Sequence, residues 1–200
     1  MTTGKPRLVV ATRNAHKTEE IRQMIGDRYE VLNATDFPDL PEVEETGTSF
    51  LENATLKAVA VSRLVEGMVL SDDSGLEVDA LDGRPGVWSS SFGGEEGNHA
   101  RNNARLMEEM ADKEDRRARF RCVMVLAVAG RVIADFSGAV EGSILPEERG
   151  EGGFGYDPYF APEGYAESFA ELGAEVKNQL SHRARALGQV VAFLDSFPNA

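Results

Sequence analysis

The sequence predicts an α/β fold built on a mixed β-sheet with helices on both faces. Strand-like apolar runs and helix-like segments interleave along most of the chain, an order typical of α/β proteins. The exception is a pair of long strand-like segments that meet at Gly130 and predict a hairpin. Of the 200 residues, 42% are apolar, so a sizeable core can form. No internal repeat or linker is visible, and residues 1–200 are therefore expected to form one domain.

Each element is predicted from its apolar spacing and from the residues that start or stop it. Ser49-Phe50-Leu51-Glu52 matches a capping box and opens the second helix. Helices are expected at residues 18–25, 49–65, 98–110 and 181–197. Strands are expected at residues 8–11, 29–34, 68–71, 75–81, 120–129 and 132–140. Residues 35–47, broken by prolines and a glycine, and the glycine-rich residues 150–158 are expected to be loops.

Composition and charge exclude several classes of partner. Acidic residues outnumber basic ones by 34 to 21, and a net charge of −13 disfavours binding to a nucleic-acid polymer. The basic residues 116–121 indicate a solvated strand end, with a phosphate site as the alternative. No stretch approaches the roughly 20 apolar residues of a membrane span, and residues 1–7 lack the apolar region of a signal peptide. Since the single Cys122 cannot form an internal disulfide either, we expect a cytoplasmic protein.

The first candidate for ligand binding is the turn Thr12-Arg13-Asn14-Ala15-His16-Lys17, between a predicted strand and a predicted helix. Backbone N–H groups at a helix N-terminus favour anions, and Lys17 adds a positive charge. Thr12 and Asn14 add neutral donors, so the turn could hold a triphosphate. It lacks the glycine spacing of a P-loop, and an ordinary helix cap with a surface lysine is the alternative.

Pairs of carboxylates form the second candidate. Glu44-Glu45 lies in a predicted loop, and Asp72-Asp73 comes directly after an apolar strand and before Gly75. Sites in α/β sheets gather at the carboxyl ends of strands, and carboxylates from separate loops commonly hold Mg²⁺ beside substrate phosphates. Lys57, which shares a helix face with Asn53, could reach a phosphate. Solvated loop carboxylates and a solvated helix lysine are the alternatives.

Two later segments offer flat rings and further donors. From Gly152 to Pro158, glycines let a ligand approach the backbone, and Phe154 and Tyr156 offer faces on which a base can stack. Lys177 and then His182-Arg183 supply donors near the start of the last helix. The alternatives are a tight turn with two core aromatics and a surface His-Arg pair.

In chain order, these segments form five motifs: T-x-N-x-x-K, E-E-T-G-x-x-F-x-E-N-A-x-x-K-A, D-D-S-G-L-x-V-D-x-L-x-G-x-P-G, G-G-F-G-Y-D-P and K-N-x-x-S-H-R. Their order and spacing resemble the inosine/xanthosine triphosphate pyrophosphatase family, also called the non-standard purine nucleotide pyrophosphatases, over residues 8–192. The resemblance implies an elongated α/β fold with two lobes and a central cleft, and a homodimer. It also implies hydrolysis of ITP, dITP or XTP to the monophosphate and pyrophosphate.

The resemblance further implies a role for each matching residue. Asp73 is similar to the family's proton acceptor and, together with Glu44, to its ligands for Mg²⁺. Substrate binding is expected from the phosphate turn Thr12, Arg13, Asn14, Ala15, His16 and Lys17, from Lys57 and Ser74, from the base-and-sugar loop Phe154, Gly155, Tyr156 and Asp157, and from the base-recognition residues Lys177, His182 and Arg183.

Three positions depart from the family pattern, and two other functions remain open. Arg13 stands where glycine is frequent, Ser91 where an arginine is usual, and Val176 where glutamate is frequent. A Maf-like pyrophosphatase, acting on pyrimidine or modified nucleotides, would usually begin with a Ser-Pro-Arg-Arg loop, which is absent here. A nucleotide-sensing module without catalysis would not need the metal ligands and both lysines together.

Overall fold

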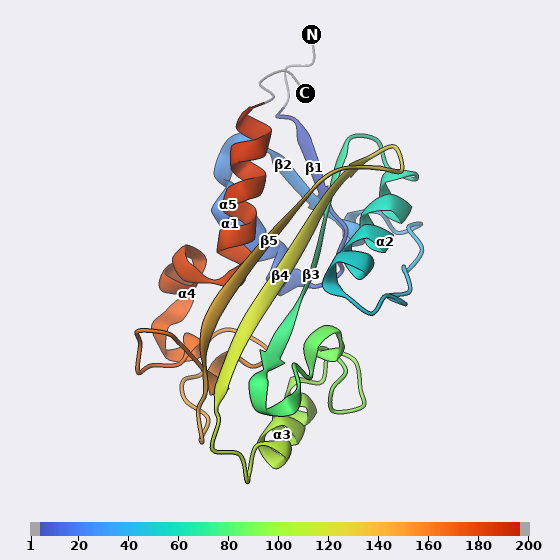
Figure 1. Cartoon of the computed structure of the whole chain (residues 1–200). Helices are drawn as coiled ribbons and strands as arrows, with labels where there is room; N and C mark the ends of the chain where they lie inside the picture. Colours follow the sequence, from blue (N-terminus) through green and yellow to red (C-terminus); the bar gives the residue numbers. More distant parts are fainter. Residues whose placement is uncertain (1–4, 197–200) are drawn as a thin grey trace. The chain divides into compact units, whose positions relative to one another are not determined.

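The computed structural model describes residues 5–196 as a six-stranded sheet with the order β2-β1-β3-β4-β5-β6 (Figure 1). β1 pairs in parallel with β2 and β3, and β5 pairs antiparallel with β6, so the predicted mixed α/β sheet is confirmed. The strands are β1 (Arg7–Val10), β2 (Glu30–Asn33), β3 (Met68–Val78), β4 (Arg117–Val128), β5 (Arg131–Ile144) and β6 (Phe160–Pro162). The α-helices are α1 (Ala15–Ile25), α2 (Phe50–Ser62), α3 (His99–Glu109), α4 (Phe169–Leu180) and α5 (His182–Asp195).

The chain divides into two compact units. The first unit comprises residues 1–73, 123–137 and 186–200, and the second comprises residues 74–122 and 138–185. β3, β4, β5 and α5 each contribute residues to both units. Residues 1–4 of the predicted polar segment and residue 197 of the last predicted helix lie outside the described residues. The central cleft that the family resemblance implies stays a prediction.

Helices cover both faces of the sheet within the first unit (Figure 1). α2 packs on β3, where the Ser71 hydroxyl donates to the Ala54 carbonyl at 2.7 Å. α5 packs on β5, where the ring centroids of Phe136 and Phe193 lie 5.5 Å apart. Successive side chains of a strand point to opposite faces, so the three consecutive buried apolar residues of β1, Leu8 to Val10, serve both layers. Its Val9 belongs to the core cluster that includes residues of α2 and β3.

β3 differs from the sequence prediction at the carboxylates. The sequence predicts two strands with Asp72 and Asp73 between them, directly after the first. The structure has one strand, Met68–Val78, so both residues lie within it and the predicted loop position is wrong. The continuation is explained by charge, because Lys17 contacts Asp72 and Lys57 contacts Asp73. Carboxylates with ammonium partners can be buried in a strand that they would otherwise interrupt.

An aromatic core stabilises the second unit. The rings of Phe120, Phe160 and Phe169 lie with their centroids between 4.7 and 6.2 Å apart. Leu106 from α3 and Tyr156 from the glycine-rich segment belong to the same buried cluster. The glycine-rich segment is therefore attached to a packed core, although it has little regular structure of its own.

Local signals predicted most of the α-helices and strands but missed α4 and the short β6. The hairpin at Gly130 is confirmed, and φ is positive at both turn residues, 49° at Ala129 and 77° at Gly130, as in a type I′ turn. The capping box at Ser49 is also present. The sequence analysis missed α4, although Ser168 and the glutamate three residues later form a second capping box. Gly173, with φ 77° and ψ 174°, interrupts the helical conformation and obscures its periodicity.

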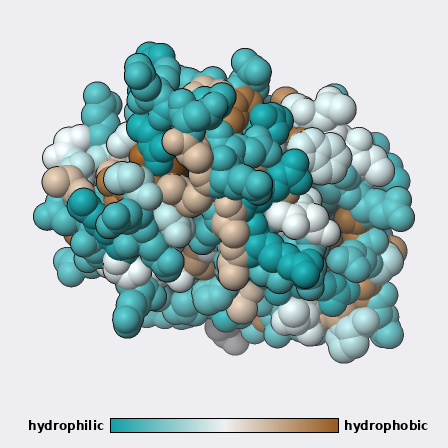
Figure 2. All heavy atoms as spheres, turned by 90° about the horizontal axis from the view of Figure 1, so that it is seen from below, coloured by the Kyte–Doolittle hydropathy of each residue, from teal (hydrophilic) through white to brown (hydrophobic). Residues whose placement is uncertain are grey.

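Most of the surface seen in Figure 2 is hydrophilic, with hydrophobic side chains in small separate patches. The basic residues 116–121 supply part of the polar surface of the second unit. Arg119 donates from Nη2 to Asp79 at 2.9 Å and from Nε to Glu141 at 3.0 Å. Arg117 likewise pairs with Asp115 at 2.7 Å, so these cations have carboxylate partners on a strand end. None of the helices within residues 5–196 combines the length and apolar character needed to cross a membrane.

Candidate active site

The predicted phosphate turn lies beside the middle of β3 in the first unit. The Ala11 N–H donates to the Leu70 carbonyl at 2.8 Å, which fixes the start of the turn against β3. Asn14 caps α1, and its side-chain oxygen accepts from the N–H groups of His16 and Lys17 at 3.0 and 3.2 Å. The predicted helix cap is therefore present. Because the cap uses two of the outward N–H groups, less of the helix N-terminus is left to bind an anion, and the phosphate role of the turn stays a prediction.

Lys17 forms an ion pair with Asp72. Its Nζ lies 2.6 Å from Asp72 Oδ1, and the exposed fractions of the two side chains are 15% and 0%. A carboxylate removed from water requires a charged or hydrogen-bonding partner. Asp72 therefore holds Lys17 against β3, a role that the sequence analysis did not assign.

Lys57 joins α2 to the carboxylates of two other segments. Its Nζ lies 3.0 Å from Glu45 Oε1 and 3.6 Å from Asp73 Oδ1. It also donates to the backbone carbonyl of Asp72 at 2.9 Å. Since only 11% of its side chain is exposed, the alternative of a solvated helix lysine is excluded.

Asp73 has an unusually high proton affinity for a carboxylic acid. Burial raises its pKa from 3.8 to about 6, against the lowering effect of Lys57 and Lys17 and with a smaller raising effect of Glu45 and Asp72. Its Oδ2 is buried and meets no hydrogen-bond donor within residues 5–196. A buried carboxylate oxygen without a donor is suited to bind a cation or to accept a proton.

The carboxylates of the first unit fit a divalent cation that also binds its substrate. Mg²⁺ prefers oxygen ligands and typically uses one or two carboxylates, several waters and substrate phosphates. Asp73 Oδ2 has the chemistry of such a ligand, and its assignment as one stays a prediction. Among the described residues, no group of three or more acidic, His or Cys side chains could hold a metal by itself. The structure brings Glu45 to Lys57, whereas Glu44 is exposed in an irregular segment. The assignment of Glu44 as a ligand stays a prediction.

Side-chain hydrogen bonds anchor the glycine-rich loop of the second unit. Asp157 Oδ2 accepts from the Phe154 N–H at 2.8 Å and from Lys177 Nζ at 2.7 Å. The Tyr156 hydroxyl donates to the Ser89 carbonyl at 2.8 Å, and burial raises the pKa of this phenol well above its usual range. The loop is therefore held by interactions from several parts of the second unit. Phe154, only partly buried, can still offer ring surface to a base.

Cationic side chains surround the Phe154 ring. Lys177 Nζ lies 4.4 Å and Arg183 Cζ 5.9 Å from its centroid, within the range of cation–π attraction. Arg183 is only 1% exposed, and its Nη2 donates to Ser74 Oγ at 2.9 Å. His182 is buried as well, so the alternative of a surface His-Arg pair is wrong. The roles of these residues in base recognition stay predictions.

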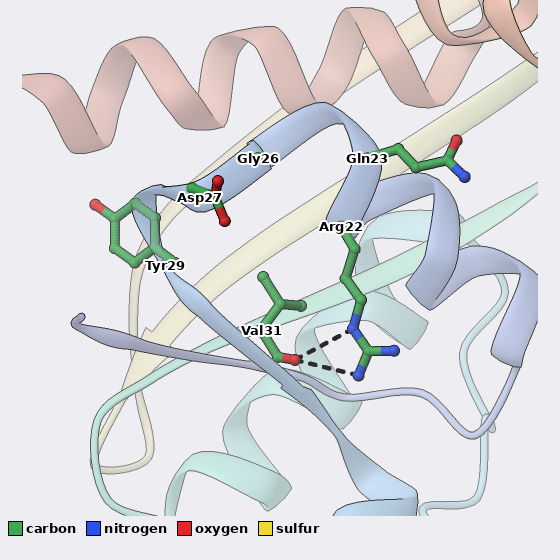
Figure 3. A pocket seen from close by; sticks show the side chains of 6 residues that line it. All are labelled: Arg22, Gln23, Gly26, Asp27, Tyr29 and Val31. Atoms are coloured by element: carbon green, nitrogen blue, oxygen red, sulfur yellow. Dashed lines mark hydrogen bonds between the residues drawn. The ribbon is translucent and has the colours of Figure 1, made fainter. Parts of the chain in front are cut away.

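A separate hollow in the first unit contains none of the predicted site residues. Its volume is about 390 Å³, and it is lined by Arg22, Gln23, Gly26, Asp27, Tyr29 and Val31 (Figure 3). Arg22 donates from Nε and Nη2 to the Val31 carbonyl at 3.3 and 3.2 Å across its wall. Nothing in its lining suggests the chemistry found around Asp73.

Comparison with models of known protein families shows to which family the chain belongs. A model of the Ham1 family matches residues 8–193, nearly its whole length. The chain belongs to the Ham1 family. The resemblance predicted from its five motifs is thereby confirmed, because similar members of the same family carry the name dITP/XTP pyrophosphatase.

Relatives of this Ham1 family member share both sequence and fold with it. A dITP/XTP pyrophosphatase of Geobacillus kaustophilus is 49% identical over 183 residues, which cover 90% of each chain. Another, of Streptococcus pyogenes, is 47% identical over 92% of this chain, which spans only 57% of that longer protein. The Ham1 protein structures of Staphylococcus aureus and Coxiella burnetii match 96% of this chain and 99% of their own, with TM-scores of 0.85 and 0.87 at 37% and 36% identity.

One departure of this Ham1 family member from the family pattern has a structural explanation. Arg13 donates from Nη2 to the Leu40 carbonyl at 2.6 Å. It therefore ties the phosphate turn to the segment that leads to Glu44 and Glu45. The other two departures, Ser91 and Val176, have no contact in the described residues that explains them.

Proposed function

We propose that this protein hydrolyses the non-standard purine nucleoside triphosphates ITP, dITP and XTP to the monophosphate and pyrophosphate. The observation that carries the proposal is the pair Asp73-Ser74. Asp73 belongs to the lysine–carboxylate cluster of the first unit, which consists of Lys17, Glu45, Lys57, Asp72 and Asp73. Ser74 accepts a hydrogen bond from Arg183, which lies over the Phe154 ring. One peptide bond thus joins residues suited to phosphates with residues suited to a purine base. The name of the Geobacillus relative supports the same substrate class.

The lysine–carboxylate cluster supplies the proposed chemistry at the phosphates. Asp73, whose pKa is raised to about 6, takes a proton from the attacking water. Lys17 and Lys57, held on carboxylates in a largely buried setting, stabilise the charge that develops on the leaving pyrophosphate. Mg²⁺ held by Asp73 and Glu44, with Glu45 as a nearby alternative, would neutralise phosphate charge and orient the water.

The donors around Phe154 explain a preference for 6-keto purines. Hypoxanthine and xanthine present O6 and N7, both acceptors, whereas adenine presents an amine in place of O6. Arg183, His182 and Lys177 donate to the keto edge but would face a second donor on adenine. A buried donor left without an acceptor costs about 1–3 kcal/mol, and more if it is charged. Guanine shares O6 and N7, so its rejection has to arise at its 2-amino group.

Arg183→Ala is expected to narrow the ratio of kcat/KM for ITP over ATP by about 10- to 100-fold, the effect of one charged hydrogen bond to the keto edge. The ratio is measured by pyrophosphate release from both nucleotides. Arg185→Ala is the matched control, because Arg185 is exposed on the same helix and donates to the backbone carbonyl of Ala139 at 2.6 Å. An unchanged ratio in Arg183→Ala would exclude base recognition by this side chain.

Removal of divalent cations is expected to abolish turnover of ITP. Asp73 and the triphosphate are both negatively charged, and without a divalent cation most of this charge stays uncompensated. Pyrophosphate release is measured after dialysis against EDTA and again after addition of excess Mg²⁺, which should restore it. Undiminished release in EDTA would exclude a metal-dependent reaction.

The remaining proposals rest on the family resemblance and on charge. They are assembly as a homodimer, a cytoplasmic location, and action on free nucleotides without a nucleic-acid polymer or a membrane. Since no residue is assigned to the ribose 2′-hydroxyl, ITP and dITP should be similar substrates.

A further inference from the structure

Asn53 attaches the acidic segment, residues 41–47, to the start of α2. The residue is only 2% exposed, and its Oδ1 accepts from the Gly47 N–H at 2.8 Å. A Cβ added to Gly47 would lie 2.6 Å from the Cβ of Glu52 and 2.7 Å from Asn53 Oδ1. Such a side chain would push the segment off the helix, because Gly47 packs directly on the first turn of α2.

This contact extends the order of the helix start toward Glu45. Glu52 Oε2 accepts from the backbone N–H groups of residues 48 and 49 at 2.7 and 3.1 Å, as in an ordinary capping box. Asn53 binds one residue further back, at Gly47, which is two residues from Glu45. Within residues 5–196, no backbone N–H of the acidic segment donates to a backbone carbonyl. The path of the chain beside Glu45 therefore depends on the bond to Asn53.

The bond to Gly47 and the ion pair of Glu45 close a ring on one face of α2. Asn53 and Lys57 are four residues apart on this helix and share a face. Lys57 Nζ lies 3.0 Å from Glu45 Oε1, although 42% of the Glu45 side chain is exposed. An ion pair with an exposed partner is usually weak, because two long side chains have to be ordered to form it. Fixing the backbone at Gly47 reduces the freedom that Glu45 has to lose.

We propose that Asn53 is a positioning residue for the reaction, because it fixes the acidic segment and so holds Glu45 against the Lys57 ammonium. Lys57 also donates to the Asp72 carbonyl at 2.9 Å, so the pair with Glu45 determines the second direction in which its ammonium is held. Preorganised charge stabilises a transition state only where the new charge develops. The inference rests on the proposed function, which assigns Lys57 to the leaving pyrophosphate.

Asn53→Leu tests the proposal, because it removes the acceptor at nearly constant volume. We expect kcat for ITP at saturating Mg²⁺ to fall about 10- to 100-fold, the effect of a misplaced catalytic group, with a smaller change in KM. The lost hydrogen bond should also lower the melting temperature by roughly 2–4 °C. Gly47→Ala should reproduce the loss of kcat with Asn53 intact, because its Cβ has no room against α2.

Glu52→Ala is the matched control. It removes the neighbouring capping interaction but keeps the Cβ against which Gly47 packs, so it should lower the melting temperature by a similar amount and leave kcat unchanged. An equal fall of kcat in Glu52→Ala and Asn53→Leu would show that Asn53 acts through stability alone and would overturn the proposal.

A double substitution tests whether Asn53 acts through Glu45. In a protein that already carries Glu45→Ala, the change Asn53→Leu should cause no further loss of kcat, because the carboxylate that Asn53 positions is gone. Losses that multiply in the double variant would exclude this route.

Hydrogen exchange of the Gly47 amide tests the contact without relying on activity. Followed by NMR in the absence of nucleotide and Mg²⁺, the amide should be protected in the wild type and in Glu52→Ala, and the protection should be lost in Asn53→Leu. Rapid exchange in the wild type would overturn the inference and leave the proposed function intact. Wild-type protein with a protected Gly47 amide that releases no pyrophosphate from ITP would instead overturn the proposed function.

Discussion

Asp73→Asn is expected to lower kcat for ITP by about 10²- to 10⁴-fold while the protein remains folded. An amide cannot take the proton of the attacking water and is a poorer ligand for Mg²⁺ than a carboxylate. The substitution is nearly isosteric, and Lys57 keeps Glu45 as a partner at 3.0 Å. The measurement is pyrophosphate release at saturating ITP and Mg²⁺. Asp112→Asn, at a side chain that is 82% exposed, is the control and should retain full activity.

The same substitution should stabilise the metal-free protein, with a defined dependence on pH. Burial raises the pKa of Asp73 from 3.8 to about 6, so the stability of the folded state is greatest while this group is protonated. That stability is complete below pH 3.8 and is lost as the pH rises through about 6. At 1.36 kcal/mol per pKa unit the loss is on the order of 2–3 kcal/mol.

The melting temperature in EDTA measures this effect. Asp73→Asn should melt higher than wild type at about pH 7.5, and the difference should shrink at about pH 4.5. Identical pH profiles for the two proteins would contradict the buried, proton-binding Asp73, whereas full catalytic activity of Asp73→Asn would contradict its proposed role in the reaction.

Asp157→Asn is expected to destabilise the protein by about 3 kcal/mol, because it leaves the buried ammonium of Lys177 facing a neutral amide. The two charged groups lie 2.7 Å apart, with side chains 3% and 5% exposed. For a chain of this length the loss corresponds to a fall of roughly 10 °C in melting temperature. Since Asp157 also accepts from the Phe154 N–H, the ITP/ATP selectivity should decline in parallel.

A double substitution tests whether the loss of stability in Asp157→Asn comes from the broken ion pair or from altered packing. Asp157→Asn combined with Lys177→Met removes both charges, and replacing a buried pair by neutral groups is often far less destabilising than removing one partner. The double variant should therefore melt well above Asp157→Asn in thermal unfolding. Additive losses from the two single variants would contradict a coupled pair.

The sequence indicates which residues could form the site, but it does not predict their backbone setting. The run from Asp72 to Gly75 indicates a loop because aspartate, serine and glycine are depleted in strands. The structure keeps the run within β3, because Lys17 from α1 and Lys57 from α2 neutralise its carboxylates. Both contacts join segments far apart in the chain, so no local pattern encodes them.

Elements marked by a local sequence pattern could be predicted, whereas contacts between distant segments could not. The capping box at Ser49 is a short-range pattern and was predictable, whereas the one at Ser168 was obscured by Gly173 within α4. The bonds from Arg13 to the Leu40 carbonyl and from Asn103 to the Gly155 carbonyl end on backbone atoms. A backbone acceptor leaves no trace in the identity of its residue, so such contacts become visible only in the structure.

The most direct test of the account is a comparison of kcat/KM for pyrophosphate release from ITP, dITP, XTP, GTP, ATP, CTP and UTP with Mg²⁺. Phosphorus NMR identifies the products. We predict monophosphate and pyrophosphate from ITP, dITP and XTP, with a preference of at least about 100-fold over ATP. A preference for pyrimidine nucleotides, as in a Maf-like enzyme, or binding of ITP without pyrophosphate release, as in a sensing module, would contradict it.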